Sequence, residues 1–310
     1  MAAFAGAFGC ISQVGIVPAH AALGRAHRLS REQAAMKCTA TAAMFLLIPA
    51  LGWTSSPLDG TWKADLDKTH WPSKPDVFAL QNGVYTCSTC VPSYSVKADG
   101  LDQAVTGHPY YDFVNVAIID ERTVLKMAKR QGKTVITEKF TVSGDGNTAT
   151  DELTDSSASS STPMVAKTEL RRVSAGAPGS HAISGSWRVA SVTSSDNSIT
   201  TTFKTSGDSI IMSTPMGQSY TAKLDGSDAV YNGDPGTTSV SVRKIDAHTI
   251  EETDKRGARV ITVIRWSVDA DGRTIHARFD DRLHGVVTNM VGHKDRGCPT
   301  RAVPRGVSAP

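Results

Sequence analysis

The sequence lacks the short motifs by which many enzyme active sites are recognised. It contains no Gly-x-Ser-x-Gly nucleophile elbow, no His-Glu-x-x-His zinc motif, no phosphate-binding P-loop and no G-x-G-x-x-G dinucleotide fingerprint. Because distant residues can converge in a folded chain, these absences lower the expectation of an enzyme without removing it. We therefore predict a non-enzymatic protein with no cofactor and no metal. After residue 52, histidines are scattered along the sequence, at positions 70, 108, 181, 248, 276, 284 and 293.

The sequence also has little excess charge. It holds 33 basic and 30 acidic residues, but four of the basic and one of the acidic residues lie in positions 1–52, which leaves 29 of each sign. A neutral body with interspersed charges offers no electrostatic footprint for nucleic acid. No helix-turn-helix pattern is present either. We expect no nucleic acid among its partners, and the sequence identifies no protein partner.

Cysteine is scarce, with five in the whole chain. Cys10 and Cys38 lie before residue 53, and Cys298 is an odd thiol near the C-terminus. The remaining pair, Cys87 and Cys90 in "CSTC", can close a small disulfide in an oxidising compartment. Turn and strand residues follow the pair, whereas a thioredoxin-type motif needs a helix N-terminus, and a zinc site needs a second pair. A local disulfide or two inactive thiols is the favoured interpretation, with redox or metal chemistry as the alternative.

Apolar runs are short. The stretch "MKCTATAAMFLLIPALGW", from Met36 to Trp53, is too short for a comfortable transmembrane helix. Its lysine, its brief apolar core and the small-residue pattern at positions 50–52 are typical of a secretory signal peptide. We expect a leader over 1–52 with the signal peptide at about 36–52, and a periplasmic or secreted mature chain with no integral membrane segment. A poorly ordered tail without a targeting role is the alternative.

What the sequence does contain is an internal repeat. The stretch "KRQGKTVITEKFTVSGDGNTA", which starts at Lys129, returns as "KRGARVITVIRWSVDADGRTI", which starts at Lys255, 126 positions later. Nearer the front the offset is 125, because Trp62 of "GTW" matches Trp187 of "GSW". This period exceeds the 20 to 50 residues of solenoid units and falls in the size range of a domain with its own core.

The repeat predicts two homologous domains, at about 58–173 and 183–294. Between them, the linker 174–182 contains "SAGAPGSH", whose small, Gly and Pro residues resist regular structure. We expect each repeat to enclose its own core, and residues 295–310 to form a flexible basic tail.

Within each repeat, apolar and polar residues alternate, and helical periodicity is hard to find. Dipeptides such as Asn82-Gly83 and Asp271-Gly272 tolerate the positive φ that tight hairpins need. Short connections make neighbouring strands antiparallel. The pattern predicts an all-β protein of two tandem up-and-down antiparallel barrels, with β-sandwiches as the alternative. In the first repeat we expect strands near 60–66, 76–81, 83–88, 93–98, 112–119, 122–128, 133–143, 147–154 and 164–173.

Two carboxylates distinguish the inward face of the first repeat. In the second repeat this face of 260–268 reads Val, Thr, Ile, Trp, Val; in the first it reads Thr134, Ile136, Glu138, Phe140, Val142. Glu138 therefore replaces Ile264, and on the next strand Asp151 replaces Ala277. Burying an unpaired carboxylate costs several kcal/mol or forces it to take up a proton. One interpretation places both carboxylates at the wet rim of the barrel or pairs one of them with Lys126; the sharper hypothesis is a roomier, polar-lined cavity in repeat one.

The segment "GHPYYD", from Gly107 to Asp112, is the most reactive-looking loop. It gathers His108, Tyr110 and Tyr111, whereas the second repeat offers "GDPGTT". Histidine titrates near neutrality and tyrosine supplies an amphipathic contact surface, so the loop is a candidate gate for a barrel mouth or a partner contact. A Gly-x-Pro turn with exposed side chains is the alternative.

The tripeptides "GTW" and "GSW", each opening a strand meander, resemble the first-strand Gly-x-Trp motif of the calycins, the lipocalins and fatty-acid-binding proteins. The resemblance implies a lipocalin-like barrel that holds one small apolar ligand. "KADLDKTHWPSKPD", after Trp62, is too short for the two-helix lid of fatty-acid-binding proteins. Lipocalins also pack a last-strand arginine on this tryptophan; Arg171 or Arg172 offers one in repeat one, while "VVTNMV" of repeat two offers none. The whole chain also resembles uncharacterised exported proteobacterial proteins with the same duplicated layout.

These observations predict an exported, non-enzymatic protein whose two lipocalin-like repeats bind a small apolar molecule. The alternative is a structural or protein-interaction module of the cell envelope with filled barrels, since small barrels are often filled by side chains. The candidate ligand-binding residues are His108, Tyr110, Tyr111, Glu138, Phe140 and Asp151.

Overall fold

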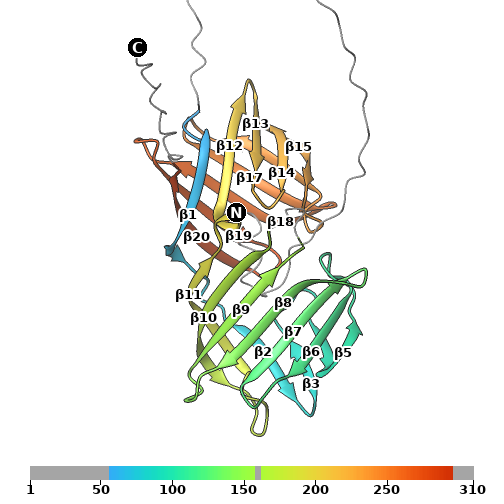
Figure 1. The fold of residues 1–310 in the computed structure, drawn as a ribbon. Helices are drawn as coiled ribbons and strands as arrows, with labels where there is room; N and C mark the ends of the chain where they lie inside the picture. Colours follow the sequence, from blue (N-terminus) through green and yellow to red (C-terminus); the bar gives the residue numbers. More distant parts are fainter. Residues whose placement is uncertain (1–55, 158–161, 296–310) are drawn as a thin grey trace, which may run out of the picture.

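The computed structural model describes residues 56–157 and 162–295, and in these residues the protein is almost entirely β-structure. Two antiparallel barrels stand one above the other (Figure 1). A short helix, α2 (Asp196–Ile199), lies where the chain passes from one barrel to the other. The expected all-β fold of two tandem barrels is confirmed. The predicted leader, the basic tail, Cys10, Cys38 and Cys298 lie outside the described residues.

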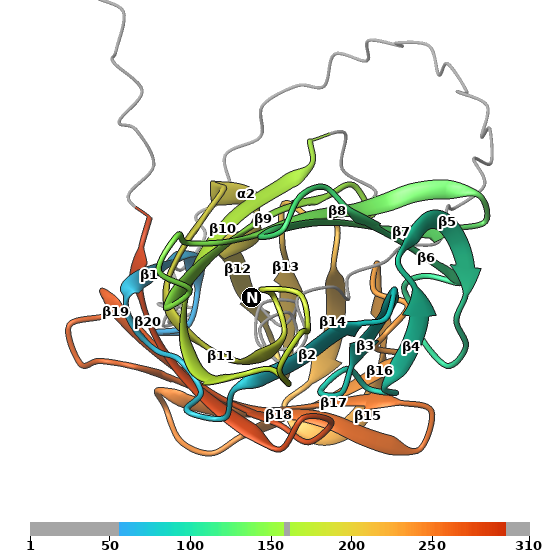
Figure 2. The same cartoon turned by 90° about the horizontal axis from the view of Figure 1, so that it is seen from below.

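The first barrel is a ten-stranded sheet that is formed by consecutive strands of the chain. Viewed along its axis, the sheet curls into a ring (Figure 2). Its strands pair in the order β4-β3-β2-β11-β10-β9-β8-β7-β6-β5. Their bounds are β2 (Asp76–Gln81), β3 (Val84–Cys87), β4 (Tyr94–Lys97), β5 (Asp99–Ala104), β6 (Phe113–Ile118), β7 (Thr123–Arg130), β8 (Lys133–Val142), β9 (Thr148–Asp155), β10 (Met164–Ala175) and β11 (Gly185–Ser194).

The second barrel is closed by a strand from the far end of the described chain. Strand β1 (Gly60–His70) pairs with both β12 and β20 and completes a closed ten-stranded ring. Figure 1 shows β1, in blue, among the yellow to red strands of the upper barrel. The other bounds are β12 (Thr200–Ser206), β13 (Ser209–Ser213), β14 (Ser219–Lys223), β15 (Asp225–Asn232), β16 (Ser239–Lys244), β17 (Thr249–Arg256), β18 (Arg259–Val268), β19 (Thr274–Asp281) and β20 (Val286–Lys294).

The two repeats have therefore exchanged their first strands, and the expectation that each repeat encloses its own core is wrong. Trp62 of the first repeat is fully buried in the second barrel, and Trp187 of the second repeat is fully buried in the first. The structural units are 76–194 and, for the other barrel, 60–70 with 200–294. The chain crosses between barrels at 71–75 and at α2.

The segment 174–182 is not an inter-domain linker. It belongs to the hairpin that joins β10 to β11 within the first barrel. The His181 N–H donates to the Leu80 carbonyl at 2.9 Å, and the Leu80 N–H donates to Ser184 Oγ at 2.8 Å. These contacts hold the Gly- and Pro-containing connection against β2. Such residues fit a turn of irregular backbone as well as they fit a flexible linker, so composition alone could not separate the two.

The strands form where the sequence alternates. Along β8, Ile136, Glu138, Phe140 and Val142 are buried, as the alternation predicts. The predicted inward face is wrong at the start of both matching strands: Thr134 on β8 and Val260 on β18 are exposed, where the ladders shift register between Ala128 and Lys129 and between Asp254 and Lys255. Tight turns use residues that tolerate positive φ, such as Asn82 at 52°.

Strand β5 was absent from the sequence prediction, and it forms one side of a seam in the first barrel. Its residues, "DGLDQA", are mostly exposed, so they carry no apolar alternation by which a strand is recognised. It does not pair with β4, whereas the corresponding β14 and β15 pair through Ser219–Asn232 and Tyr220–Tyr231. The sequence before β4 holds Pro92, which has no N–H to donate to a ladder.

The disulfide between Cys87 and Cys90 lies at this seam. Both cysteines are buried, and the second barrel has buried methionines, Met212 and Met216, at the corresponding places. The fold thus fills the same position either with a disulfide or with two thioethers. In the strand register, Met212 lies opposite Phe203 as Cys87 lies opposite Phe78.

A cation covers each buried first-strand tryptophan. The Arg172 guanidinium lies 3.9 Å from the centre of the Trp187 ring, and Lys294 Nζ lies 4.8 Å from that of Trp62. Both cations come from the strand that pairs with the tryptophan strand, β10 beside β11 and β20 beside β1. The segment "VVTNMV" of repeat two holds no arginine, and Lys294, three positions beyond it, takes the corresponding place.

Arg172 also fastens the connection between β10 and β11, so its removal is expected to weaken the first barrel. Its guanidinium donates to the Ser184 and Ala182 carbonyls, each at 2.6 Å, and to the Gly146 carbonyl. Charge-assisted hydrogen bonds and the cation–π contact together predict a loss of about 2 kcal/mol in Arg172→Ala, measured by urea unfolding.

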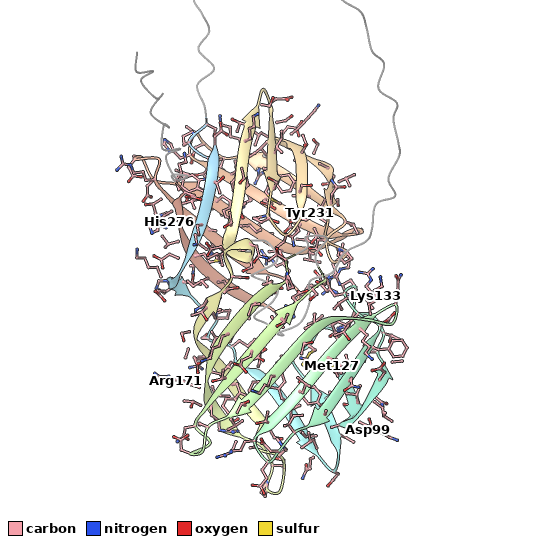
Figure 3. All side chains as sticks on the ribbon, in the orientation of Figure 1. Asp99, Met127, Lys133, Arg171, Tyr231 and His276 are labelled. Atoms are coloured by element: carbon pink, nitrogen blue, oxygen red, sulfur yellow. A yellow bond between two sulfur atoms is a disulfide. The ribbon has the colours of Figure 1, made fainter. Side chains whose placement is uncertain are left out.

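Two variants make the Arg172 experiment specific. Arg172→Lys should lose less, because a lysine covers Trp62 in the second barrel. Arg171→Ala should change little, because Arg171 points away from the barrel (Figure 3). Equal losses in the alanine variants at 171 and 172 would contradict this role of the guanidinium.

Candidate functional site

The candidate site lies inside the first barrel, where three neighbouring strands each place a charged side chain on the inner face. Lys126 on β7 lies directly opposite Glu138 on β8, and Asp151 on β9 lies opposite Phe140, one inward position away. Lys126 Nζ and Glu138 Oε2 are 2.6 Å apart, and their side chains are only 7% and 5% exposed. Such burial of an ion pair costs desolvation free energy that its geometry must offset.

Asp151 is the least satisfied member of this group. It is 1% exposed, and neither of its carboxyl oxygens has a hydrogen-bond partner among the described residues. Burial, with the nearby charge of Glu138, raises the pKa of Asp151 well above its usual range. The carboxyl group therefore favours its protonated form, and it remains a buried group that needs a hydrogen-bonding partner.

A second acidic group, Asp76, approaches the ion pair from β2. It is 5% exposed and accepts a hydrogen bond from Thr89 Oγ1 at 3.3 Å. Burial raises the pKa of Asp76 to about 7, and the charges of Glu138 and Lys126 also act on it. Three carboxyl groups thus face a single buried ammonium, which leaves this interior short of positive charge and of hydrogen-bond donors.

Tyrosine rings surround the charged groups. Tyr85 on β3 and Tyr94 on β4 lie close enough to Lys126 and Glu138 to interact with their charges, and burial raises the pKa of each tyrosine. Burial by itself lowers the pKa of Lys126, but the Glu138 carboxylate and these two tyrosines outweigh it, so the net shift is upward and Lys126 stays protonated. The Tyr94 hydroxyl has no hydrogen-bond partner in the described residues. It is a further polar atom available to a ligand.

The loop between β5 and β6 closes the seam of the barrel. His108 stacks on Tyr111 with ring centres 4.7 Å apart, and Tyr94 meets His108 edge-on at 5.4 Å. His108 and Tyr111 are 8% and 2% exposed, so the alternative of an exposed turn is wrong for both. Burial, with the positive charges of Arg256 and Lys126, lowers the pKa of His108 to about 4, so the imidazole is neutral near pH 7.

Tyr110 points away from this group and toward the second barrel. Its hydroxyl lies where a side chain on Gly236 would begin, 1.8 Å from the ideal Cβ position, so only glycine fits there. The hydroxyl also hydrogen-bonds to Asp234. The loop that was expected to act as one unit thus divides: His108 and Tyr111 close the first barrel, while Tyr110 contacts the rim of the second.

Phe140 belongs to an apolar wall beside the charges. Its ring meets Phe78 edge-on at 5.9 Å and Trp187 at 5.5 Å. Trp187 reaches this position only because the first strands are exchanged. The interior therefore has a polar side, formed by the three charged strands, and an aromatic side to which the second repeat contributes.

Of the six predicted residues, five have side chains in or around the interior of the first barrel. The sixth, Tyr110, contacts the second barrel instead. Sequence reasoning identified Glu138 and Asp151 from strand alternation and named Lys126 as a pairing partner, which the structure bears out at 2.6 Å. It missed Asp76, Tyr85 and Tyr94. Asp76 opens β2, and Tyr85 lies just after the Asn82-Gly83 turn. At such positions, alternation shows whether a side chain points inward only once the neighbouring strand is known.

The arrangement is suited to binding more readily than to bond cleavage. It supplies buried acceptors, a protonated amine and aromatic surface, and His108 and Tyr111 close the seam between β4 and β5. Within residues 56–157 and 162–295, no group of three or more His, Cys, Asp or Glu side chains is placed to hold a metal ion. In the same residues, no helix is both long and apolar enough to span a bilayer.

The chain matches no known protein family, and no curated protein matches it.

Proposed function

We propose that the protein is an exported, non-enzymatic carrier whose first barrel binds a small molecule. The ligand has an apolar body, which packs on Phe78, Phe140 and Trp187, and a head that donates hydrogen bonds. The signal-peptide pattern in 36–52 supports the export. The calycin-like Gly-x-Trp strands, each with a cation on the tryptophan face, support a ligand-holding barrel.

The observation that carries the proposal is Asp151. A fully buried carboxyl group without a partner destabilises a protein, and such groups are concentrated where function requires them. The second barrel shows that the fold does not need it, because Ala277 occupies the corresponding place at 4% exposure. A hydroxyl or amine on the ligand would satisfy the Asp151 carboxyl group, and the Tyr94 hydroxyl in the same barrel offers a further polar contact.

This placement refines the expected ligand. The sequence predicted an apolar molecule, and the apolar wall suits one. The buried Lys126–Glu138 pair and Asp151 favour a molecule that also carries a hydroxyl or amine, since a purely apolar ligand would leave their polar atoms without partners.

A second candidate function is a cell-envelope interaction module with filled barrels. The observation in its favour is the continuous aromatic contact from Phe78 through Phe140 to Trp187 across the first barrel. The stacked rings of His108 and Tyr111 also close the seam in the barrel wall.

Replacement of Asp151 by alanine distinguishes the two functions. We expect Asp151→Ala to raise the free energy of unfolding by about 1–3 kcal/mol, because it removes a buried group without a partner. We also expect the variant to lose a ligand that the unaltered protein carries when purified from its own host. Native mass spectrometry of the full chain measures the bound mass, and chemical unfolding measures the stability.

Glu152→Gln is the matched control, because Glu152 is the next residue on β9 and its side chain is 54% exposed. It should keep both the ligand and the stability. A clean unliganded mass for the unaltered protein after gentle purification would favour the interaction module. A bound mass that persists in Asp151→Ala would show that this carboxyl group does not hold the ligand.

A further inference from the structure

The interior of the second barrel contains two carboxyl groups that no lysine or arginine within residues 56–157 and 162–295 neutralises. Glu252 and Asp254 lie two positions apart on β17, so both point inward, and they are 1% and 2% exposed. In the described parts of the chain, neither forms an ion pair with a lysine or arginine. One oxygen of each, Glu252 Oε1 and Asp254 Oδ1, has no hydrogen-bond partner there. In the first barrel, the position that corresponds to Glu252 is occupied by Lys126, whose ammonium pairs with a buried carboxylate.

The two groups act as a pair. They lie close enough to hydrogen-bond to each other, and burial, followed by the charge of Glu252, raises the pKa of Asp254. The other oxygen of Glu252, Oε2, accepts hydrogen bonds from the Tyr220 hydroxyl at 3.0 Å and from Trp266 Nε1 at 2.8 Å. These donors fix the Glu252 carboxylate in place with its second oxygen unsatisfied. A pair that shares one proton carries one negative charge, which matches a monovalent cation.

Aromatic rings line the same space. Tyr220 and Tyr231 are buried with ring centres 5.8 Å apart, and the charges of Asp254 and Glu252 reach both. Tyr231 lies in the upper barrel, toward the end that faces the first barrel (Figure 3). Faces of tyrosine and tryptophan attract ammonium groups, especially where water is excluded. At this end the buried Gln218 Nε2 is a further polar atom without a partner in the described residues.

This chemistry favours an organic ammonium over a metal ion. Calcium takes six to eight oxygen ligands, and zinc takes four ligands in a tetrahedron. The pair supplies two carboxyl groups among aromatic rings, and no third metal-binding side chain completes a group in the described residues. An ammonium needs only the carboxylate, acceptors and aromatic faces that are present.

We propose that the second barrel binds a protonated organic amine, held by Glu252 and Asp254 and covered by the rings of Tyr220 and Tyr231. The amine takes the place that the Lys126 ammonium fills among acidic groups and tyrosines in the first barrel. This inference goes beyond the proposed function, because it concerns the other barrel and a different set of residues.

The test is calorimetric titration of the intact chain with 2-phenylethylammonium and, separately, with the neutral 2-phenylethanol. We expect the ammonium to bind at least about tenfold more tightly than the alcohol, the factor that one charged contact commonly contributes. Glu252→Gln and Asp254→Asn should each remove this preference. Both variants should melt at the same or a higher temperature than the unaltered protein, because each removes one of two buried carboxyl groups that lack a cationic partner among the described residues.

Two controls separate this proposal from the others. Glu251→Gln alters the neighbouring carboxylate on β17, which pairs at 2.8 Å with Arg243 on the outer face, and it should leave ammonium binding unchanged. Asp151→Ala should also leave it unchanged, whatever the variant does to a ligand of the first barrel. The proposal is overturned if the ammonium does not bind at millimolar concentration, if the alcohol binds equally well, or if calcium or zinc displaces the ammonium. It is equally overturned if the variants keep the preference, or if they lower the melting temperature and so show that the carboxyl groups serve only the fold.

Discussion

Removal of residues before Trp71 is expected to open the second barrel and to leave the first barrel folded. Strand β1 pairs on one side with β12 and on the other with β20, so its loss creates two exposed sheet edges. It also removes Trp62, which is fully buried in that barrel, and removal of a core tryptophan alone costs about 3–5 kcal/mol. Because proteins of this size are stable by only about 5–15 kcal/mol, the second barrel should lose its closed structure.

Limited proteolysis and tryptophan fluorescence measure this outcome separately for each barrel. A shortened chain that begins at Trp71 should be cut within 200–294 and should keep a resistant fragment of about 76–194, which contains every strand of the first sheet. A peptide of residues 56–70, added to the shortened chain, should restore resistance in the second half. The strand exchange would be refuted if the shortened chain lost the first barrel and kept the second, the result that separate repeats predict.

Loss of the buried ammonium of Lys126 is expected to be the most damaging single substitution in the first barrel. In Lys126→Met, Glu138 becomes a buried carboxylate without its partner, and Asp151 and Asp76 add two more acidic groups nearby. Breaking a buried ion pair by removing one partner costs about 3–5 kcal/mol. Urea unfolding, followed by tryptophan fluorescence, measures the loss.

The double variant Lys126→Met with Glu138→Ile should recover most of this stability, because an apolar pair of similar volume avoids the desolvation of two charges. Ile264 already occupies the Glu138 position in the second barrel and is fully buried there. Glu138→Ile alone should be destabilising, since it leaves Lys126 without its partner. Lys139→Ala, which removes an exposed pair with Glu152 on adjacent strands, should change little. A double variant as unstable as Lys126→Met would mean that packing, and not charge, dominates at this position.

Much of the fold follows from local pattern. Alternation along 133–142 and 148–155 assigns strands and inner faces, because a pleated strand directs successive side chains to opposite sides. The pattern fails for Asp99–Ala104, where both faces are wet and no apolar period remains. It also fails at Val260, where a bulge in the ladder reverses the face.

The candidate site also contains some residues that the sequence predicts and others that it does not. Alternation and comparison of the repeats identify Glu138 and Asp151 as inward carboxyl groups. Neither predicts that Tyr110 leaves its neighbours His108 and Tyr111 for the second barrel, because the direction of a loop side chain depends on the surface it meets. Nor do they predict that Trp187 of the second repeat forms the wall beside Phe140.

The sequence by itself determined that the chain is two related antiparallel β-barrels with charged groups inside one of them, because hydrophobic period and self-similarity are properties of the chain alone. Only the tertiary structure decided which barrel each first strand completes. The strands that begin "GTW" and "GSW" present the same buried tryptophan, so either fits either barrel. The choice depends on the connections. The turn before β11 hydrogen-bonds to β2 and to Arg172, and these contacts hold β11 in the first barrel. Strand β1 then completes the second barrel.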